Sequence, residues 1–252
     1  MCLILFAYKV NLKYPLIVAA NRDEIFQRPT ASLHYWEDYP EIVAGRDLEK
    51  SGTWLGVTNT GRFAALTNYR NPREQTDGLR SRGELVTDFL KGNDAPENFL
   101  VKIHELHTSY PGFNLLVGSM EDLYYYSNVE QKIKQLTPGI YGLSNALLNT
   151  NWPKVERGTV ELKNLIKTSC NKDITKELIH ILQDAEGFSD EKLPHTGVSI
   201  DWERMLAPIF IKSDNYGTRS STVVLMCDKT IQITERVYTD TPPSQQTITI
   251  TL

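Results

Sequence analysis

Cys2, directly behind Met1, is the residue with the clearest potential for chemistry in this sequence. Aminopeptidases remove an initiator Met that precedes a small side chain, so we expect Met1 to be removed. Cys2 would then carry a thiol and a free α-amine on one carbon, which makes a nucleophile with its own base. The pKa of such an amine is about 7.7–8.0, so it can accept the thiol proton near neutral pH. The alternative is a small apolar residue at the head of a strand.

Four consecutive polar residues follow an apolar run in the segment AANRDEI, with no Gly or Pro to make an ordinary turn. If the apolar runs 3–8 and 15–20 form a hairpin, the end of the second strand lies beside the start of the first. We therefore expect some of these polar groups, Asn21 and Arg22 among them, to lie next to Cys2. The alternative is a solvated strand end, where ion pairs contribute little.

Two asparagines stand at the ends of apolar runs, Asn68 in TNYRNP and Asn145 in YGLSNALL. An Asn in a turn usually serves the backbone, because it tolerates left-handed conformation. Its side-chain amide is also a suitable donor to an oxyanion. Because the chain breaks before a helix at this point, we expect the Asn145 side chain to face a cleft rather than the core.

A metal site is not expected. His104 and His107 stand three apart on a predicted helix, but no third ligand of matching type is evident, which favours a solvated helix face. The other three histidines show no partnership with a cysteine, so a Cys/His catalytic pair has no support.

The elements that must position these residues follow the order strands, helices, strands, helices, strands. Such an order is typical of an α+β fold with mostly antiparallel sheet, and about ten strands favour two packed sheets. The predicted helices are 82–90, 95–106 and two within 152–182, broken near 169–172. The predicted strands are 3–8, 15–20, two within 53–69 that turn at 59–61, then 112–118, 123–127, one that ends in the segment GLSN at 142–145, 209–212, 218–226, 230–237 and 247–252.

Composition is that of an ordinary globular protein of 252 residues, 40% hydrophobic and 23% charged. The net charge of −4 argues against a nucleic-acid partner, because such proteins carry a basic surplus. No linker divides the chain, so we expect residues 1–252 to form a single domain. The stretch LILFAY is too short for a membrane span.

The three cysteines show no CxxC spacing, which excludes a disulfide framework and favours a reducing compartment. We expect the protein to be cytoplasmic. If positive charge surrounds Cys2, its thiolate fraction at neutral pH should exceed that of Cys170 and Cys227.

An ordered set of segments resembles the NRDE family, which includes the Transport and Golgi Organization 2 proteins. The segments are NRDE, GRD…SGTWLGVTNTGRFAALTNYR, SRGELV, GFNLLVG, GLSN…WPKV and YGTRSSTVV, and they run from Cys2 to Val237. That family is similar to the N-terminal nucleophile hydrolases, in the cysteine branch with penicillin V acylase and bile-salt hydrolase. The resemblance implies a four-layer αββα sandwich, with two antiparallel sheets between helical layers.

The resemblance also implies roles for individual residues. Cys2 would be the nucleophile, and Asp23 would orient its α-amine. Asn68 and Asn145 would help to form the oxyanion site and to hold the nucleophile.

Arginines near the nucleophile differ from the acylase pattern. The acylases carry an Arg three residues before the Asp, where this chain has Ala20, and Arg22 in a strand would point to the opposite face from Asp23. Arg219 is a loose counterpart of a second acylase arginine. We take Asn21, Arg22 and Arg219 as candidates for substrate binding.

The function that follows is a cysteine amidohydrolase or acyl transferase acting on a small amide or acyl substrate, with no metal or organic cofactor. One alternative, from the family resemblance, is a non-enzymatic protein on the same fold that binds and traffics haem, lipid or acyl groups; the sequence has no CxxCH site. Another is a degenerate hydrolase fold in which Cys2 is structural.

Overall fold

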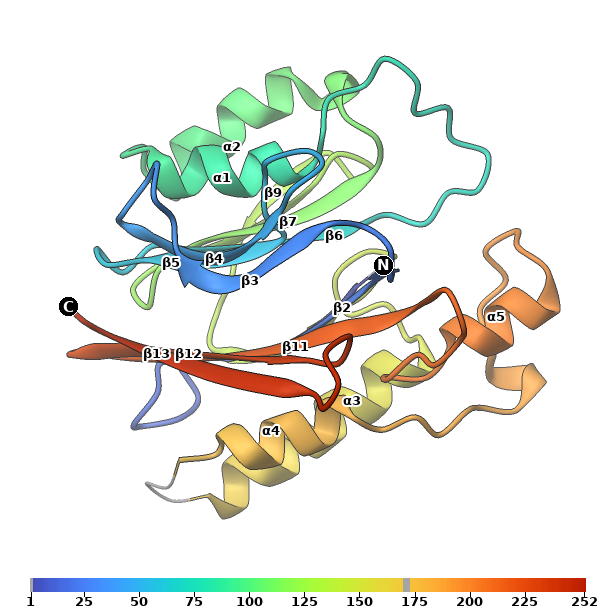
Figure 1. Cartoon of the computed structure of the whole chain (residues 1–252). Coiled ribbons are helices and arrows are strands. Elements are labelled where there is room, and N and C mark those ends of the chain that lie inside the picture. Colours follow the sequence, from blue (N-terminus) through green and yellow to red (C-terminus); the bar gives the residue numbers. More distant parts are fainter. Residues whose placement is uncertain (1, 170–172) are drawn as a thin grey trace.

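Two antiparallel sheets pack face to face between layers of helices in the computed structural model, which describes residues 2–169 and 173–252 (Figure 1). In strand order, the six-stranded sheet holds β10 (Gly139–Leu143), β1 (Cys2–Tyr8), β2 (Leu16–Ile25), β11 (Tyr216–Cys227), β12 (Thr230–Val237) and β13 (Ser244–Thr251). The seven-stranded sheet runs β3 (Thr30–Tyr35), β4 (Ile42–Asp47), β5 (Leu55–Thr58), β6 (Phe63–Asn68), β7 (Phe113–Gly118), β8 (Leu123–Ser127) and β9 (Lys132–Gln135).

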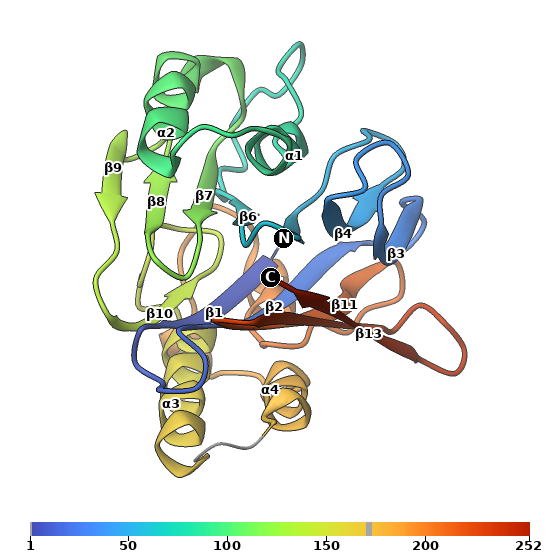
Figure 2. The same ribbon diagram turned by 90° about the vertical axis from the view of Figure 1, so that its left-hand side faces the viewer.

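The helices cover the outer faces of the sheets, which completes the four-layer αββα sandwich. Figure 2 shows α1 (Gly83–Lys91) and α2 (Pro96–Glu105) over the seven-stranded sheet, and α3 (Pro153–Thr168) and α4 (Thr175–Leu182) over the six-stranded sheet. A short helix, α5 (Ile200–Leu206), lies to the side of the layer that α3 and α4 form. Of the helices in residues 2–169 and 173–252, none is both long enough and apolar enough to cross a membrane.

Strands β1 and β2 of the six-stranded sheet are buried on both faces along most of their length. Ile4 and Phe6 of β1 pack between the sheets, whereas Leu3 and Leu5 pack toward α3 and α4. Because side chains alternate along a strand, β1 reads as an unbroken apolar run rather than as apolar–polar alternation. The same alternation decides which polar residues at the strand ends face the space between the sheets.

The predicted α+β class, the first hairpin and the two packed sheets are confirmed, and the predicted strand at 209–212 is wrong. Ile209 and Ile211 are buried, so the apolar signal is genuine, but the segment is a loop after Pro208. Its main chain bonds Thr218 rather than a strand ladder. The break between α3 and α4 falls where it was predicted, although residues 170–172 lie outside the described chain.

Four elements were missed. The strands β3 and β9 are mixed or polar in sequence, β4 is a short run interrupted by glycine, and α5 spans only seven residues. These segments are too short for their hydrophobic periodicity to predict a strand or helix. They take up their structure through pairing and packing in the folded chain.

Candidate functional site

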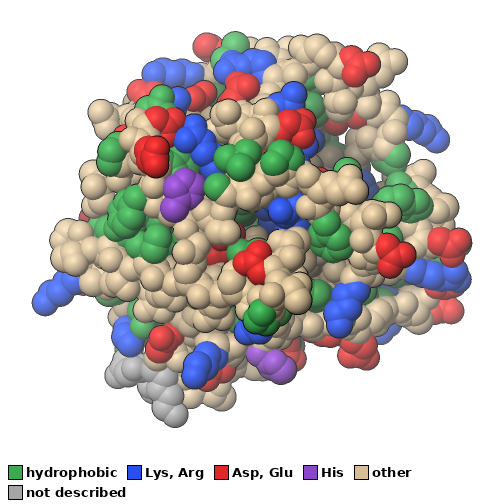
Figure 3. Space-filling view, in the orientation of Figure 1, with side chains coloured by type: hydrophobic (Ala, Val, Ile, Leu, Met, Phe, Trp, Pro, Cys, Tyr) green, Lys and Arg blue, Asp and Glu red, His purple; other side chains and the backbone are tan. Residues whose placement is uncertain are grey.

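A cavity of about 630 Å³ opens between the sheets, and Cys2 lies on its wall. The wall comes from the end of β2, the loop between β4 and β5, the end of β6 and the start of α1. Five lining residues are Lys or Arg and four are Asp or Glu, so nine of the twenty lining residues are charged. Figure 3 shows Lys and Arg side chains within a recess on this face of the molecule.

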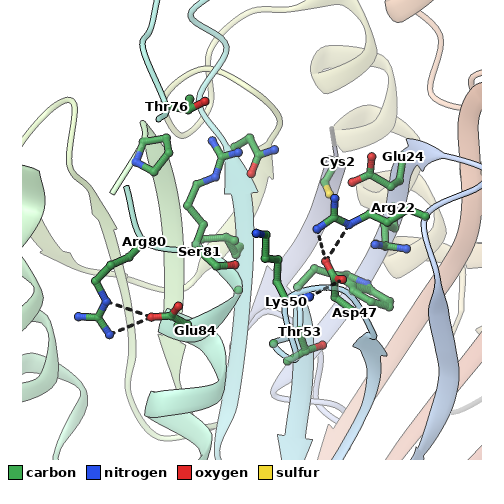
Figure 4. A pocket seen from close by; sticks show the side chains of 18 of the residues that line it. Cys2, Arg22, Glu24, Asp47, Lys50, Thr53, Thr76, Arg80, Ser81 and Glu84 are labelled. Atoms are coloured by element: carbon green, nitrogen blue, oxygen red, sulfur yellow. Dashed lines mark hydrogen bonds and ion pairs between the residues drawn. The ribbon is translucent and has the colours of Figure 1, made fainter. Parts of the chain in front are cut away.

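The β1–β2 hairpin places Cys2 directly opposite Arg22. Since Ile4 and Ala20 of the same two strands pack between the sheets, Cys2 and Arg22 face that space too. Figure 4 shows Arg22 and Glu24 beside Cys2. The expectation that the polar end of the second strand lies next to Cys2 is confirmed.

The Cys2 thiol is held in its protonated form by its surroundings. Burial raises its pKa, Arg22 and a hydrogen bond from the Asp23 main chain lower it, and the Asp23 carboxylate raises it. In Cys227, burial raises the pKa, but hydrogen bonds with Thr230 and Lys229 lower it to below its usual value. The pKa of Cys2 is thus shifted upward and that of Cys227 downward, which is opposite to the order of thiol acidity predicted from the sequence for these two cysteines; Cys170 lies outside the described residues.

Asp23 lines the cavity from the helix-facing side of β2 and is 1% exposed. Thr218 Oγ1 donates a hydrogen bond to Asp23 Oδ1 at 2.7 Å. Burial raises the pKa of Asp23, and the charge of Lys154 lowers it. The hydrogen bond from Thr218 holds the Asp23 carboxylate in position.

Lys154, near the start of α3, is a buried cation behind Asp23. The residue is 2% exposed, and its Nζ donates to the Leu206 carbonyl at 2.8 Å. Burial lowers its pKa to about 8, against the charge of Asp23, which raises it. Lys154 supplies positive charge on the helix-facing side of β2, where its charge acts on Asp23.

A buried ion pair extends this network. Arg70 Nη1 lies 2.9 Å from Glu203 Oε2, and the two side chains are 7% and 3% exposed. The Thr196 main-chain N–H and hydroxyl both donate to Glu203 Oε1. The Arg70 guanidinium also stacks on Trp152, 4.6 Å from the ring centroid. The pair ties the segment after β6 to α5.

The two predicted asparagines occupy different places. Asn68 ends β6 and lines the cavity. Asn145 is 1% exposed, is not on the cavity wall, and donates from Nδ2 to the Asn68 carbonyl at 2.9 Å. The expectation that Asn145 faces a cleft is wrong, because its amide is used to join β6 to the segment after β10. The neighbouring Ser144 hydroxyl donates to the Cys2 carbonyl at 3.1 Å and so holds the head of β1.

Two predicted substrate-binding residues lie away from the cavity. Asn21 faces the helix layer, where its Nδ2 donates to the Leu182 and Ile209 carbonyls. Arg219 Nη1 donates to the main-chain carbonyls of Ile25, Phe26 and Arg28, at 3.0, 2.7 and 2.9 Å. Both side chains are bound to the main chain of their neighbours, so neither contributes to the pocket.

The motif GRD…SGTW builds the loop opposite Cys2. Asp47 accepts main-chain hydrogen bonds from Glu49 and Lys50 and forms an ion pair with Arg28 at 2.8 Å. A Cβ added at Gly52 would lie 2.6 Å from the main chain of Gly83, so glycine is required where the loop touches α1. These contacts fix the loop across the cavity from β2.

Residues 1–240 match the family model described as "Transport and Golgi organisation 2". The chain belongs to this family. It is 33% identical to the mouse Transport and Golgi organization 2 homolog, with 97% of this chain and 96% of that protein covered. Identity to the human homolog is 34%, over 95% and 94% of the two chains, and to the Drosophila melanogaster protein 28%, over 90% and 88%.

Solved structures show the fold. A Caenorhabditis elegans ortholog of N-acylethanolamine-hydrolyzing acid amidase superposes with a TM-score of 0.54 at 12% identity, over 90% of this chain and 94% of that one. A C2A mutant of conjugated bile acid hydrolase from Clostridium perfringens gives a TM-score of 0.54 at 10% identity, over 98% and 92%. The family member described here therefore has the N-terminal nucleophile hydrolase fold.

Several charged residues of the site were not found from the sequence. Lys154 in WPKV stands in the first turn of a helix, where a lysine is usually solvated. Arg70 and Glu203 are distant in sequence, and only the fold brings them together. Lys50 and Arg82 lie in segments quoted for the resemblance, but nothing in their spacing indicates a shared cavity. The signal that could have indicated Lys50, Arg82 and Lys154 was the position of each charged residue inside a segment quoted for the resemblance.

The described residues contain no group of three or more His, Cys, Asp or Glu side chains that could hold a metal ion. Haem needs an axial ligand and a slot for a largely apolar ring. Cys2 offers a thiol, but the charged wall of this cavity does not suit the ring faces, and we derive no step through haem.

Proposed function

We propose that this family member is a cysteine amidohydrolase or acyl transferase of the N-terminal nucleophile type, acting on a small amide or acyl substrate. One observation carries the proposal. Cys2 lies on the wall of a cavity of about 630 Å³ and pairs with Arg22 across the β1–β2 hairpin. Its thiol accepts a hydrogen bond from the Asp23 main chain. This volume is within the usual range of about 300–1,000 Å³ for small-molecule sites.

The reaction begins with proton transfer. The proposal requires Met1 to be removed, so that the α-amine of Cys2 takes the thiol proton while the Asp23 carboxylate orients that amine. Because burial raises the pKa of the thiol, an internal base is needed to form the thiolate. The charge of Lys154 lowers the pKa of Asp23 against the effect of burial, and so favours the ionised carboxylate.

The thiolate then attacks the substrate carbonyl and forms a C–S bond. In this proposal the side-chain amide of Asn68, which lines the cavity at the end of β6, donates to the developing oxyanion. No side-chain hydrogen bond of Asn68 is formed within the described chain, so the amide is free for this role. Collapse of the intermediate breaks the C–N bond, and the amine leaves with the proton that the α-amine had taken.

The resulting thioester is cleared by water in a hydrolase, or by an acceptor amine or alcohol in a transferase. Both structural neighbours are named for hydrolysis, one as an amidase and one as a conjugated bile acid hydrolase. At 12% and 10% identity this likeness supports the fold, and the proposed activity rests on the site. A haem carrier on the same fold has no observation here that favours it.

The proposal is tested by turnover of fluorogenic acyl amides of 7-amino-4-methylcoumarin, with short acyl groups. We expect protein lacking Met1 to release the fluorophore, and Cys2→Ala to release none. Cys227→Ala is the matched control, because this thiol is outside the cavity, and it should keep full activity. Equal release by the wild-type protein and Cys2→Ala would reject Cys2 as the nucleophile.

A further inference from the structure

Three cations on the cavity wall have no acidic partner. Within residues 2–169 and 173–252, Arg22, Lys50 and Arg82 form no ion pair shorter than 4.0 Å. The other two lining cations are neutralised, Arg28 by Asp47 and Arg80 by Glu84, each at 2.8 Å. Unpaired positive charge therefore gathers on the wall around Cys2.

Arg22 is the most deeply placed of the three. The residue is 6% exposed, its Nη1 donates to the Thr30 hydroxyl at 3.0 Å, and its guanidinium stacks on Trp54 at 4.1 Å. Burial lowers its pKa. A buried guanidinium without a carboxylate is costly, and a bound anion would offset this cost.

Arg82 approaches Cys2 from the start of α1. Its Nη1 donates to the Gly112 carbonyl at 3.1 Å, which fixes the side chain along the wall. The charges of Arg82 and Cys2 are close enough to affect each other. Glu24 is the nearby carboxylate that lacks an ion pair within the described chain, and it accepts a hydrogen bond from the Ile25 main chain.

Lys50 projects from the loop between β4 and β5. Figure 4 shows its side chain extending into the space between Cys2 and the Arg80–Glu84 pair. Its main chain is fixed, because Asp47 Oδ1 accepts the Lys50 N–H at 3.2 Å. The ammonium group is thus presented across the cavity from the nucleophile, on a loop that α1 holds in place.

We propose that the cavity selects substrates that carry a carboxylate or phosphate group, bound by Lys50, Arg82 and Arg22 while the acyl carbon lies at Cys2 Sγ. This inference rests on the proposed function for the reaction and on the unpaired cations for the specificity. A long alkyl chain is disfavoured, because it would remove these charged groups from water without pairing them.

Binding is tested separately from catalysis in Cys2→Ala, by calorimetric titration with three short amides of similar length. The probes are glutaramate, which carries a carboxylate, 4-phosphonobutanamide, which carries a phosphonate, and neutral valeramide. We expect at least one anionic probe to bind about tenfold more tightly than valeramide, equivalent to about 1.4 kcal/mol. The tighter of the two identifies the preferred anion.

Lys50→Met in the same background should remove most of this preference, and Lys50→Arg should retain it. Lys229→Met is the matched control, because Lys229 is exposed in the turn between β11 and β12, outside the cavity. Equal affinity for all three probes, or a preference that survives Lys50→Met and Arg82→Met, would overturn the anion site.

The two proposals fail in different ways. If Cys2→Ala binds an anionic probe selectively but the Met1-free protein hydrolyses no acyl amide, the anion site stands and the hydrolase does not. If valeryl and glutaryl coumarin amides are hydrolysed with equal kcat/KM, the hydrolase stands and the anion selectivity does not.

Discussion

Asn145 Nδ2 donates a hydrogen bond to the Asn68 carbonyl at 2.9 Å, and this bond joins the two sheets beside the cavity. The Asn145 carbonyl in turn accepts from the Arg70 N–H at 2.7 Å. The pair divides two roles that a sequence comparison would give to both asparagines. Asn145 holds the end of β6 in position, and Asn68 lines the cavity.

Asn145→Ala should lower the free energy of unfolding by about 1–3 kcal/mol, because it leaves the Asn68 carbonyl without its donor in a buried place. Any loss of kcat should be smaller than that of Asn68→Ala, and Asn145→Asp should not restore stability, since a carboxylate cannot donate to the carbonyl. Chemical denaturation with turnover on the same sample measures both. A stable Asn145→Ala variant with no turnover would contradict the positioning role.

Asn68→Ala should behave in the opposite way. The side chain lines the cavity, and its loss should lower kcat by about 10²–10³, the usual effect of removing one oxyanion donor. The free energy of unfolding should change little, because the bond from Asn145 is to the main chain of Asn68. Unchanged kcat with a fluorogenic acyl amide would remove Asn68 from the oxyanion site.

The sequence was sufficient to predict the placement of Cys2 beside Arg22, because the position of a hairpin's end follows from its length and apolar pattern. It was not sufficient for Lys154, since a lysine after Trp-Pro reads as an exposed first-turn residue until α3 is packed on β1. Arg219 was assigned to the site by resemblance, yet the β-bulge at this position turns its side chain toward the main chain that links β2 and β3. Side-chain direction at irregular strand positions depends on tertiary structure.

Lys154 should make stability increase with pH above neutrality. Its pKa is about 8 in the folded protein and about 10.4 in an unfolded chain, so between these values the unfolded chain binds a proton that the folded one has released. The free energy of unfolding should therefore rise in this window, relative to Lys154→Met, by up to roughly 1.4 kcal/mol per pH unit. Urea denaturation of both proteins from pH 7 to pH 10 measures the difference. Parallel curves would show that Lys154 is not a desolvated cation.

Breaking the Arg70–Glu203 pair should be strongly destabilising. Arg70→Met leaves the Glu203 carboxylate buried without its cation, which costs about 3–5 kcal/mol, and Glu203→Leu leaves Arg70 in the same condition. The double variant should be more stable than either single one, because no uncompensated charge stays buried. A double-mutant cycle of unfolding free energies measures this coupling. Additive losses would show that the two residues act independently.

The nucleophilic role of Cys2 is tested most directly by intact-mass spectrometry of natively expressed protein, alone and after brief mixing with a glutaryl coumarin amide in acid quench. The account predicts a chain without Met1 that gains the mass of one acyl group on Cys2, with no adduct in Cys2→Ala. A chain that retains Met1 and gains no acyl group from a substrate it turns over would contradict it.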